Sequence, residues 1–535
     1  MPAHHSTPEP SGTAVAVRPA EGAVARRQGL LETAAIFLMF CLHAGWAAPD
    51  VNEAHYLGKA KHYWDASFAQ GDFFFESADA HEVFYRACGW LTLFLSLPAV
   101  AWMGRLATWW LLAWSFRRLS AAIVPQAWLS VVAAALFLAL SESCHMAGEW
   151  VIGGFEAKGF AYVLVFLALE ALVRGYWARS LWLLGAASSF HVLVGGWTVV
   201  GMAFMWLFVG REGRPSAKEL TLGLAGGLLL ALPGIWPALR LEWGVDHALA
   251  DKANEIYVYQ RLRHHLTPTG FEPDQTLRHL TLIVVWFVLC ALTPYQPGTR
   301  RFRLLVTGCM LTGFVGMGVW YATKSDPALA ARLMRYYWFR MGDSLLPVGV
   351  GILAMSHMAY ARQWLVGWGS MLLGAAIAIG GTHLSGYAIQ RATLPAIPRG
   401  DRPGKVRDYH GWRDACEWIA NSPDIPADAR FITPRMAQTF KWHTGRAEVA
   451  SWKDLPQDAV SIVEWWRRMK LLHWSSPNPD DPEGRWLSSL TDRTPQELRL
   501  LGEQFSAQFL LTESGEPLEL PLLYSNDWYA VYDLR

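Results

Sequence analysis

Charged residues are scarce in this sequence of 535 residues. Asp, Glu, Lys and Arg make up only 17% of it, whereas soluble domains contain roughly 25%. The formal net charge of +1 gives no indication of a nucleic-acid partner, and we predict none. The hydrophobic fraction is 53% and there are 29 Trp, a composition typical of a protein that meets a lipid bilayer at two interfaces.

Cysteine is sparse as well. The six Cys residues form no Cys-x-x-Cys motif, and most lie in or beside apolar runs, which argues for small buried side chains rather than a disulfide framework. His264 and His265 are adjacent, but no acid or Cys is spaced to complete a zinc site with them. We therefore predict no cofactor and leave a divalent-metal requirement open.

Long apolar runs fill residues 30–388. A spanning helix needs about 20 mostly apolar residues, because the hydrocarbon core is ~30 Å thick. Residues 180–210 form one apolar stretch, broken only at His191 and Gly195–Gly196, that fits either one long helix or two short ones. We predict an α-helical polytopic membrane protein with about eleven transmembrane helices. The segments are 30–48, 97–116, 126–143, 159–173, 180–191, 193–210, 219–239, 279–294, 303–322, 344–361 and 366–387.

Basic residues mark alternate short connections between these segments. They include Arg117–Arg118, Arg211 and Arg300–Arg301, which all fall on the side of Arg26–Arg27. Because Lys and Arg in short loops stay in the cytoplasm, we predict a cytoplasmic N-terminus, with residues 1–29 as a disordered tail. An odd number of spans then places the chain after the last span outside.

The first outer loop, residues 49–96, offers a candidate catalytic acid. A helix is expected from about Asn52, with Asn52 or Asp50 as its cap. A carboxylate on a helix beside the membrane can act as a general base, so Glu53 and Asp50 are candidate catalytic residues. The structural alternative, favoured on composition alone, is an acid stabilised by the helix dipole.

Further polar side chains of the outer loops are candidate substrate ligands. Arginine forks suit phosphate and carboxylate groups, and ionisable groups at membrane depth are functional candidates by default. Interfacial charges, a satisfied core histidine and snorkelling arginines are the structural alternatives. If residues 332–343 are helical, Arg332, Arg335, Phe339 and Asp343 share one side. The candidate substrate-binding residues are Asn52, His55, Tyr56, Lys59, Glu156, Lys158, His191, Arg261, Arg263, His264, Arg335, Tyr336 and Arg340.

Residues 389–535 change in character. Prolines and charges rise over 389–404, which is typical of a linker. Residues 405–535 alternate helical segments (412–420, 458–472, 495–505) with short strands (429–433, 508–512, 528–532). This pattern predicts a small extracytoplasmic α/β domain. It contains no phosphate-binding glycine loop and no nucleophile motif, so a lid, an acceptor-binding role and a purely structural role all stay open.

The order of these parts resembles the GT-C superfamily of membrane glycosyltransferases. Its aminoarabinose and protein mannosyl transferases carry an Asp-Glu-x-x-Tyr-like motif in the first outer loop. Residues 52–56, Asn-Glu-Ala-His-Tyr, match that motif at Glu53 and Tyr56 and depart from it at Asn52, where the family has its catalytic Asp. The sequence is also similar to an uncharacterised family of bacterial membrane proteins through residues 52–63, 155–162, 335–340 and 433–442.

The GT-C resemblance implies a sugar donor carried on polyprenyl phosphate in a bacterial inner membrane. Glu53 or Asp50 would then deprotonate or position the acceptor, and the outer Arg and Lys side chains would hold the phosphate leaving group. The alternatives are a non-catalytic membrane scaffold, favoured by Asn52, or a transporter. Transporters tend to show internal repeats, and none is evident here.

Overall fold

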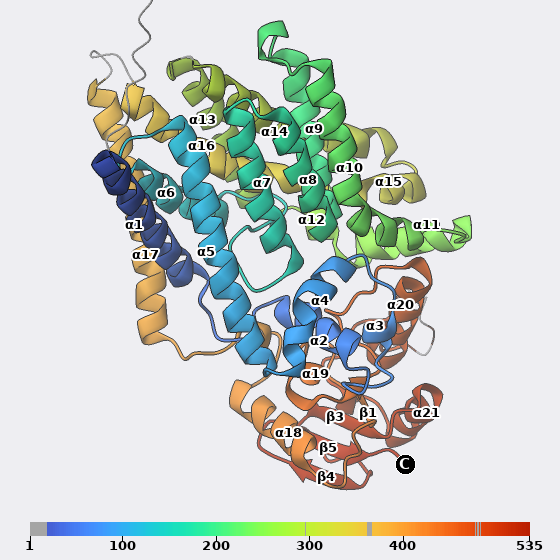
Figure 1. Ribbon diagram of the computed structural model, residues 1–535. Helices are drawn as coiled ribbons and strands as arrows, with labels where there is room; N and C mark the ends of the chain where they lie inside the picture. The colour runs from blue at the N-terminus through green and yellow to red at the C-terminus, as the bar shows by residue number, and fades with distance from the viewer. Residues whose placement is uncertain (1–18, 295, 361–365, 477, 479–480, 482) are drawn as a thin grey trace, which may run out of the picture.

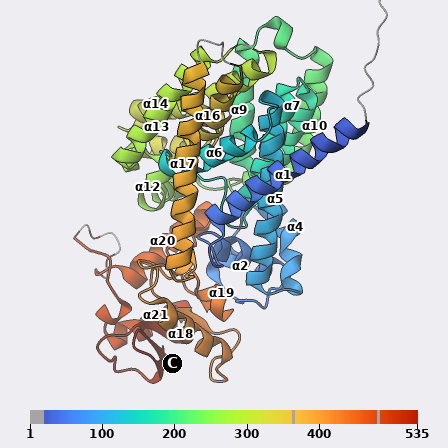
Figure 2. The same ribbon diagram turned by 90° about the vertical axis from the view of Figure 1, so that its left-hand side faces the viewer.

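The computed structural model describes residues 19–535 except 295, 361–365, 477, 479–480 and 482. A helical bundle forms one end of the molecule, and a small domain containing a β-sheet forms the other (Figure 1). The loop helices of the first outer loop lie between the two (Figures 1 and 2). The expected combination of a mostly helical chain with a small C-terminal sheet domain is therefore confirmed.

Each predicted apolar segment overlaps a helix of the bundle. Residues 180–210 form two helices that meet at His191, which ends one and precedes the other. The first helix begins at Pro19, so residues 19–29, assigned above to the tail, are helical; residues 1–18 lie outside the described residues. The bundle helices are α1 (Pro19–Ala44), α5 (Leu97–Ile123), α6 (Leu129–Ser143), α7 (Ala157–Val173), α8 (Trp177–Phe190), α9 (Val192–Phe208), α10 (Ala217–Arg240), α13 (Pro273–Leu292), α14 (Pro297–Thr323), α16 (Arg340–Tyr360) and α17 (Val366–Thr393).

Four of these helices are long and apolar enough to cross a membrane by length and composition, judged over the described residues. They are α10, α13, α14 and α17. Large apolar side chains such as Leu228, Leu229 and Val284 are exposed on them, and this surface suits contact with lipid rather than water. The structure thus supports membrane association, while the count of eleven spans stays a prediction.

The first outer loop folds into short helices. They are α2 (Glu53–Trp64), α3 (Phe73–Glu76) and α4 (Glu82–Cys88), followed by a 3₁₀ turn at Gly89–Leu93. Apolar side chains including Leu57, Phe84 and Phe155 pack them onto the start of α5 and the loop before α7. The loop is therefore a fixed part of the fold.

The other connections predicted to lie outside also contain helices. They are α11 (His247–Glu255), a π-helical turn (Ile256–Arg261), α12 (Arg263–Leu266) and α15 (Pro327–Met334). Residues 332–343 do not form the continuous helix considered above, because α15 ends at Met334, Tyr337 has a positive φ of 55° and α16 starts at Arg340. Arg332 accordingly points to solvent and pairs with Asp251, while Asp343 is buried and accepts from backbone amides of residues 146 and 147.

The C-terminal domain is built on a five-stranded sheet in the order β2-β1-β3-β5-β4. β1 pairs in parallel with β2 and with the central β3, whereas β5 runs antiparallel to both β3 and β4. The segment 389–404 is only partly a linker, because α17 continues to Thr393. The elements are α18 (Tyr409–Asn421), β1 (Arg430–Ile432), α19 (Phe440–Thr444), β2 (Ala447–Glu448), α20 (Ala459–His473), α21 (Pro495–Phe505), β3 (Phe509–Glu513), β4 (Leu522–Ser525) and β5 (Tyr529–Asp533).

Candidate functional site

A cavity of about 370 Å³ lies where the bundle, the outer loops and the C-terminal domain meet. Its wall combines the start of α2, the loop before α7, the α8–α9 break, the end of α10 and the loop after β2. Ten of the predicted site residues line it. They are Asn52, His55, Tyr56, Glu156, Lys158, His191, Arg261, Arg335, Tyr336 and Arg340.

The two predicted catalytic acids do not line this cavity. Glu53 is fully buried and forms an ion pair with Arg105, which is also fully buried. Its carboxylate accepts further hydrogen bonds from the backbone amides of Asp50 and Phe155, both at 2.7 Å. Asp50 is buried as well, and its carboxylate accepts from the amide of Val51 at 2.8 Å. Glu53 therefore has a structural role, because its carboxylate joins α2 to Arg105 of α5 and to the amide of Phe155 in the loop before α7.

Asn52 occupies the N-cap position of α2, but its side chain makes no capping hydrogen bond. Instead its amide donates to Oε2 of Glu156 at 2.9 Å. An aspartate at this position would place a second carboxylate against Glu156, which disfavours two ionised groups. The amide of Asn52 is therefore suited to donate a hydrogen bond to Glu156. Glu156 lines the cavity, whereas Glu53 and Asp50 do not.

Three predicted binding residues point elsewhere. Lys59 is buried and contacts Oγ of Ser77 at 3.2 Å and Asp79 at 3.4 Å. Arg263 is exposed and donates to the carbonyl of Thr269. The ring of His264 contacts that of His265 in a tilted arrangement, with 4.0 Å between the centroids, and His265 is the one that lines the cavity.

One side of the cavity is a compensated network of charges. The carboxylate of Glu149 forms ion pairs with Arg340 at 3.0 Å and with Lys158 at 3.4 Å. Arg340 also donates to Nε2 of His191 at 3.0 Å. Glu156 lies 3.7 Å from Lys158, so these acids and bases largely balance. Such a network can hold hydroxyl groups in fixed orientations.

Two further cations of the cavity wall, Arg261 and Lys453, form no ion pair within the described part of the chain. Arg261 donates to the carbonyl of Trp452 at 2.8 Å, and no carboxylate of the described residues lies within ion-pair distance of Arg261 or Lys453. Burial lowers the pKa of Arg261. Burial and the neighbouring Arg261 lower the pKa of Lys453 to about 7. Two adjacent cations with depressed pKa values are stabilised by an anion placed between them.

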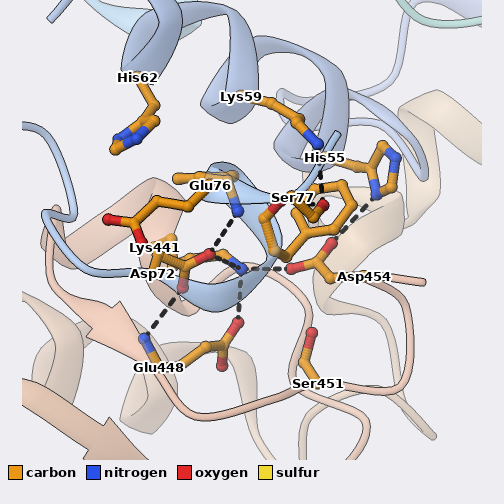
Figure 3. Close-up of polar contacts among 12 residues, drawn as sticks. His55, Lys59, His62, Asp72, Glu76, Ser77, Lys441, Glu448, Ser451 and Asp454 are labelled. Atoms are coloured by element: carbon orange, nitrogen blue, oxygen red, sulfur yellow. Dashed lines mark hydrogen bonds and ion pairs between the residues drawn. The ribbon is translucent and has the colours of Figure 1, made fainter. Parts of the chain in front are cut away.

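A buried polar cluster stands behind the cavity and joins the first outer loop to the C-terminal domain (Figure 3). Nζ of Lys441 contacts carboxylate oxygens of Asp72 at 3.2 Å, Glu448 at 3.2 Å and Asp454 at 2.5 Å. Asp454 in turn lies 3.2 Å from Nδ1 of His55, which lines the cavity. Burial lowers the pKa of His55. This cluster fixes the position of His55 and of the loop that carries Lys453.

Sequence reasoning missed several lining residues. His81, Glu149, Trp150, Tyr257, His265, Tyr337, Lys453 and Gln457 are in the wall but were not proposed. His265 and Tyr337 each follow a proposed residue directly in the sequence, and Tyr257 lies four positions before Arg261, so their positions were a usable signal. Lys453 had none, because its segment comes from a domain about 400 residues after α2 and only the fold brings it to the cavity.

No group of three or more His, Cys, Asp or Glu side chains suited to a metal ion is present in the described ranges. The three carboxylates of the cavity, Glu149, Glu156 and Glu242, all have cationic or amide partners. Any metal would therefore have to displace those partners.

Comparisons with known proteins identify little. A family model described as a domain of unknown function (DUF6798) matches residues 410–472, within the C-terminal domain. No curated protein matches the chain. Among solved structures, the apo crystal structure of the oligosaccharyltransferase from Archaeoglobus fulgidus aligns with 90% of this chain and 69% of its own, at 11% identity and a TM-score of 0.39.

Proposed function

We propose that this protein is a membrane glycosyltransferase of the GT-C type that transfers a sugar from a polyprenyl-phosphate donor to an acceptor at the outer face of a bacterial inner membrane. The observation that carries the proposal is the pair Arg261 and Lys453, two cations in the cavity wall without an acidic partner. A phosphate group supplies the missing negative charge, and its charge grows as the glycosidic bond breaks.

The cavity is placed to receive a lipid-borne donor. The end of α10 lines it through Ala238, Leu241 and Glu242. The same helix exposes Leu228, Leu232 and Leu239 along its length, a surface suited to acyl or prenyl chains. A polyprenyl tail can therefore stay in the bilayer beside α10 while its phosphate reaches Arg261 and Lys453.

The proposed step is a direct displacement at the anomeric carbon. The acceptor hydroxyl loses its proton to the carboxylate of Glu156 and its oxygen bonds to that carbon. The bond between the anomeric carbon and the phosphate oxygen breaks, and polyprenyl phosphate leaves with its negative charge held by Arg261 and Lys453. Glu149, Arg340 and His191 orient the sugar hydroxyls. Asp50 and Glu53 act in this scheme by positioning the loop that presents Asn52 to Glu156.

A transfer assay tests the proposal. Purified full-length protein in detergent is given a polyprenyl-phosphate sugar with a radiolabel in the sugar, and label in acceptor glycan and in free sugar is followed. The wild type should turn over, and the Arg261→Gln, Lys453→Gln double variant should lose at least about a hundredfold in rate, since one well-placed group of this kind supplies 2.7–4 kcal/mol. Lys252→Gln, which removes an exposed cation from α11, should keep the wild-type rate.

Equal turnover of the double variant and the wild type would contradict the proposal that Arg261 and Lys453 hold the phosphate leaving group. Absence of transfer and hydrolysis with every polyprenyl-phosphate sugar offered, in protein that binds the donor, would favour the scaffold alternative. Glu156→Gln should still bind the donor with its affinity within about threefold of the wild type while losing transfer, because the amide cannot take the acceptor proton.

A further inference from the structure

The C-terminal domain contains a second hollow, of about 450 Å³. It lies between the segment before α18, the loop after β1, the end of α20 and the end of β3. Its volume falls in the range of small-molecule sites, about 300–1,000 Å³. The lining residues that carry charge or a titratable group are Lys405, Arg407, Arg435, His473 and Glu513.

Positive charge is in excess in this pocket. Three cations face one carboxylate, that of Glu513. In the described part of the chain, neither Lys405 nor Arg435 forms an ion pair with an acid, and the guanidinium of Arg435 instead lies over the rings of Trp452 (5.5 Å) and Trp486 (4.8 Å). Burial lowers the pKa of both Lys405 and Arg435. Lys405 and Arg435 therefore both lose solvation on burial, and neither forms an ion pair that would offset this loss.

A buried polar atom points to a ligand as well. His473 lines the pocket and is only 3% exposed, yet its Nε2 has no hydrogen-bond partner among the described residues. Burial lowers the pKa of this imidazole to about 3, so it is neutral and can accept or donate one hydrogen bond. Ser488 and Ser489 add hydroxyl groups to the same wall. A buried polar group that lacks a partner calls for an occupant able to hydrogen-bond.

Packing alone does not account for this arrangement. Stacking on Trp452 and Trp486 explains why Arg435 is ordered, but an apolar side chain could cover the same rings without desolvating a charge. It also leaves Lys405 and His473 unexplained, since they come from different segments and both face the hollow.

We propose that this pocket binds an anionic saccharide, a sugar bearing a phosphate or a carboxylate. Lys405 and Arg435 receive the acidic group, and His473, Ser489 and Glu513 bond the ring hydroxyls. Glu513 suits the second role because its carboxylate already accepts from Ser489 at 3.2 Å, and an acceptor next to the cations fixes the orientation of a hydroxyl-bearing ligand. The site lies outside the cavity described above and does not depend on the proposed transfer reaction.

The pocket and the cavity share one run of basic side chains. Trp452 links them, because Arg261 of the cavity stacks on this ring at 5.6 Å and Arg435 of the pocket stacks on it at 5.5 Å. Arg261 also contributes to the lowered pKa of Lys405. The pocket and the cavity are therefore neighbours, with Trp452 between them.

Binding to the full-length protein in detergent, measured by titration calorimetry, tests the site. The probes are glucose 6-phosphate, glucuronic acid, glucose and inorganic phosphate. At least one of the two charged sugars should bind at least about tenfold more tightly than glucose and inorganic phosphate, and which of them does identifies the acidic group. Saturable binding of neither charged sugar, or inorganic phosphate binding as tightly as both, would overturn the proposal.

The location is tested with variants. Lys405→Gln with Arg435→Gln should weaken the preferred sugar by at least about tenfold. The matched control Arg413→Gln with Arg499→Gln removes two exposed cations from the same domain and should bind as the wild type does. If the double variant is unstable, Lys405→Glu alone is used instead, because it keeps the contact of Arg435 with the two Trp rings. This variant should also weaken binding of the preferred sugar. Lys453→Gln should retain the binding, which separates this site from the transfer cavity. Unchanged affinity in folded Lys405→Glu would place the ligand elsewhere.

Discussion

Glu53 and Arg105 show how burial decides what a single residue does. Both side chains are fully buried and each is the ionic partner of the other. Arg105 also donates to the carbonyl of Trp46 at 2.5 Å, and Glu53 accepts from the amide of Phe155. Three segments far apart in the sequence meet at this pair. Removing one partner of such a pair leaves an uncompensated buried charge.

We expect Glu53→Gln to lower the free energy of unfolding by about 3–5 kcal/mol, because Arg105 loses its carboxylate. The measurement is the thermal midpoint of the full-length protein in detergent. Glu82→Gln breaks the exposed pair with Arg86 and should leave the midpoint nearly unchanged. Glu53→Gln combined with Arg105→Met should recover part of the loss. A wild-type midpoint with transfer abolished would instead identify Glu53 as a reacting group.

Lys453 makes anion binding in the cavity sensitive to pH. Its pKa of about 7 means that the amine loses its charge as the pH rises through that value. Donor affinity should therefore fall between about pH 6 and pH 8. Lys453→Arg should bind the donor equally at both pH values, and Lys453→Gln weakly at both. A Lys453→Gln profile that keeps the wild-type step would assign the step to another group.

The same shift has a consequence for stability. The unfolded lysine, with its usual pKa of 10.5, keeps a proton between about pH 7 and 10.5 that the folded one has lost. The unfolded state then binds more protons, so the contribution of Lys453 to stability rises with pH across this window. Binding and stability thus change in opposite directions with pH at this residue.

At the scale of elements, close approach of α8 and α10 sets one wall of the cavity. A Cβ on Gly185 would lie 2.0 Å from the carbonyl oxygen of Gly227, and one on Gly227 would lie 2.8 Å from that of Leu181. Small residues allow helix backbones to pack this closely in membranes. The spacing holds the end of α10, with Leu241 and Glu242, against the break at His191.

Gly227→Leu should force α8 and α10 apart, lower the thermal midpoint and reduce both donor binding and transfer. Gly374→Leu is the matched control, because a Cβ at Gly374 in α17 meets no atom within 4 Å. That variant should behave as the wild type in all three measurements. Equal behaviour of the two variants would show that the close helix contact does not shape the cavity.

The sequence predicted the helices and strands more completely than it predicted contacts between side chains. Apolar runs predicted the bundle helices, and His191 with two glycines marked the α8–α9 break. In the C-terminal domain the expected helices and three strands are present, but β2 has two residues and β4 is largely exposed, so neither gave an alternating pattern. Ten of the proposed substrate-binding residues line the cavity, because they lie in or beside the loops that form it. Their role in binding a substrate stays a prediction. It could not show that Glu53 faces Arg105 or that Asn52 faces Glu156, since those pairings depend on packing between distant segments.

For the whole molecule, the decisive contact is the cluster around Lys441 that attaches the C-terminal domain to the first outer loop (Figure 3). Three carboxylates surround one ammonium, and the pKa of Lys441 is raised by the acids around it, chiefly Asp454, against the effect of its burial. Burial raises the pKa of Glu448 to about 7, so near neutral pH this acid is the titrating member. The cavity exists only while the domain is attached, since Lys453 and His55 come from its two sides.

Glu448 should therefore make the attached state pH-dependent. Between its usual pKa of 4.5 and its folded value of about 7, the folded protein holds a proton that the unfolded chain has lost. The contribution of Glu448 to stability is thus present at low pH and is lost as the pH rises through this window.

His55, whose pKa is lowered, makes a contribution to stability that changes with pH in the opposite direction, so the quantity to measure is the difference between variant and wild type. The thermal midpoint of Glu448→Gln minus that of the wild type should grow from about pH 4.5 to pH 7. Glu417→Gln, on the exposed side of α18, should give a constant difference, and a constant difference for Glu448→Gln would mean that attachment of the domain does not sense this proton.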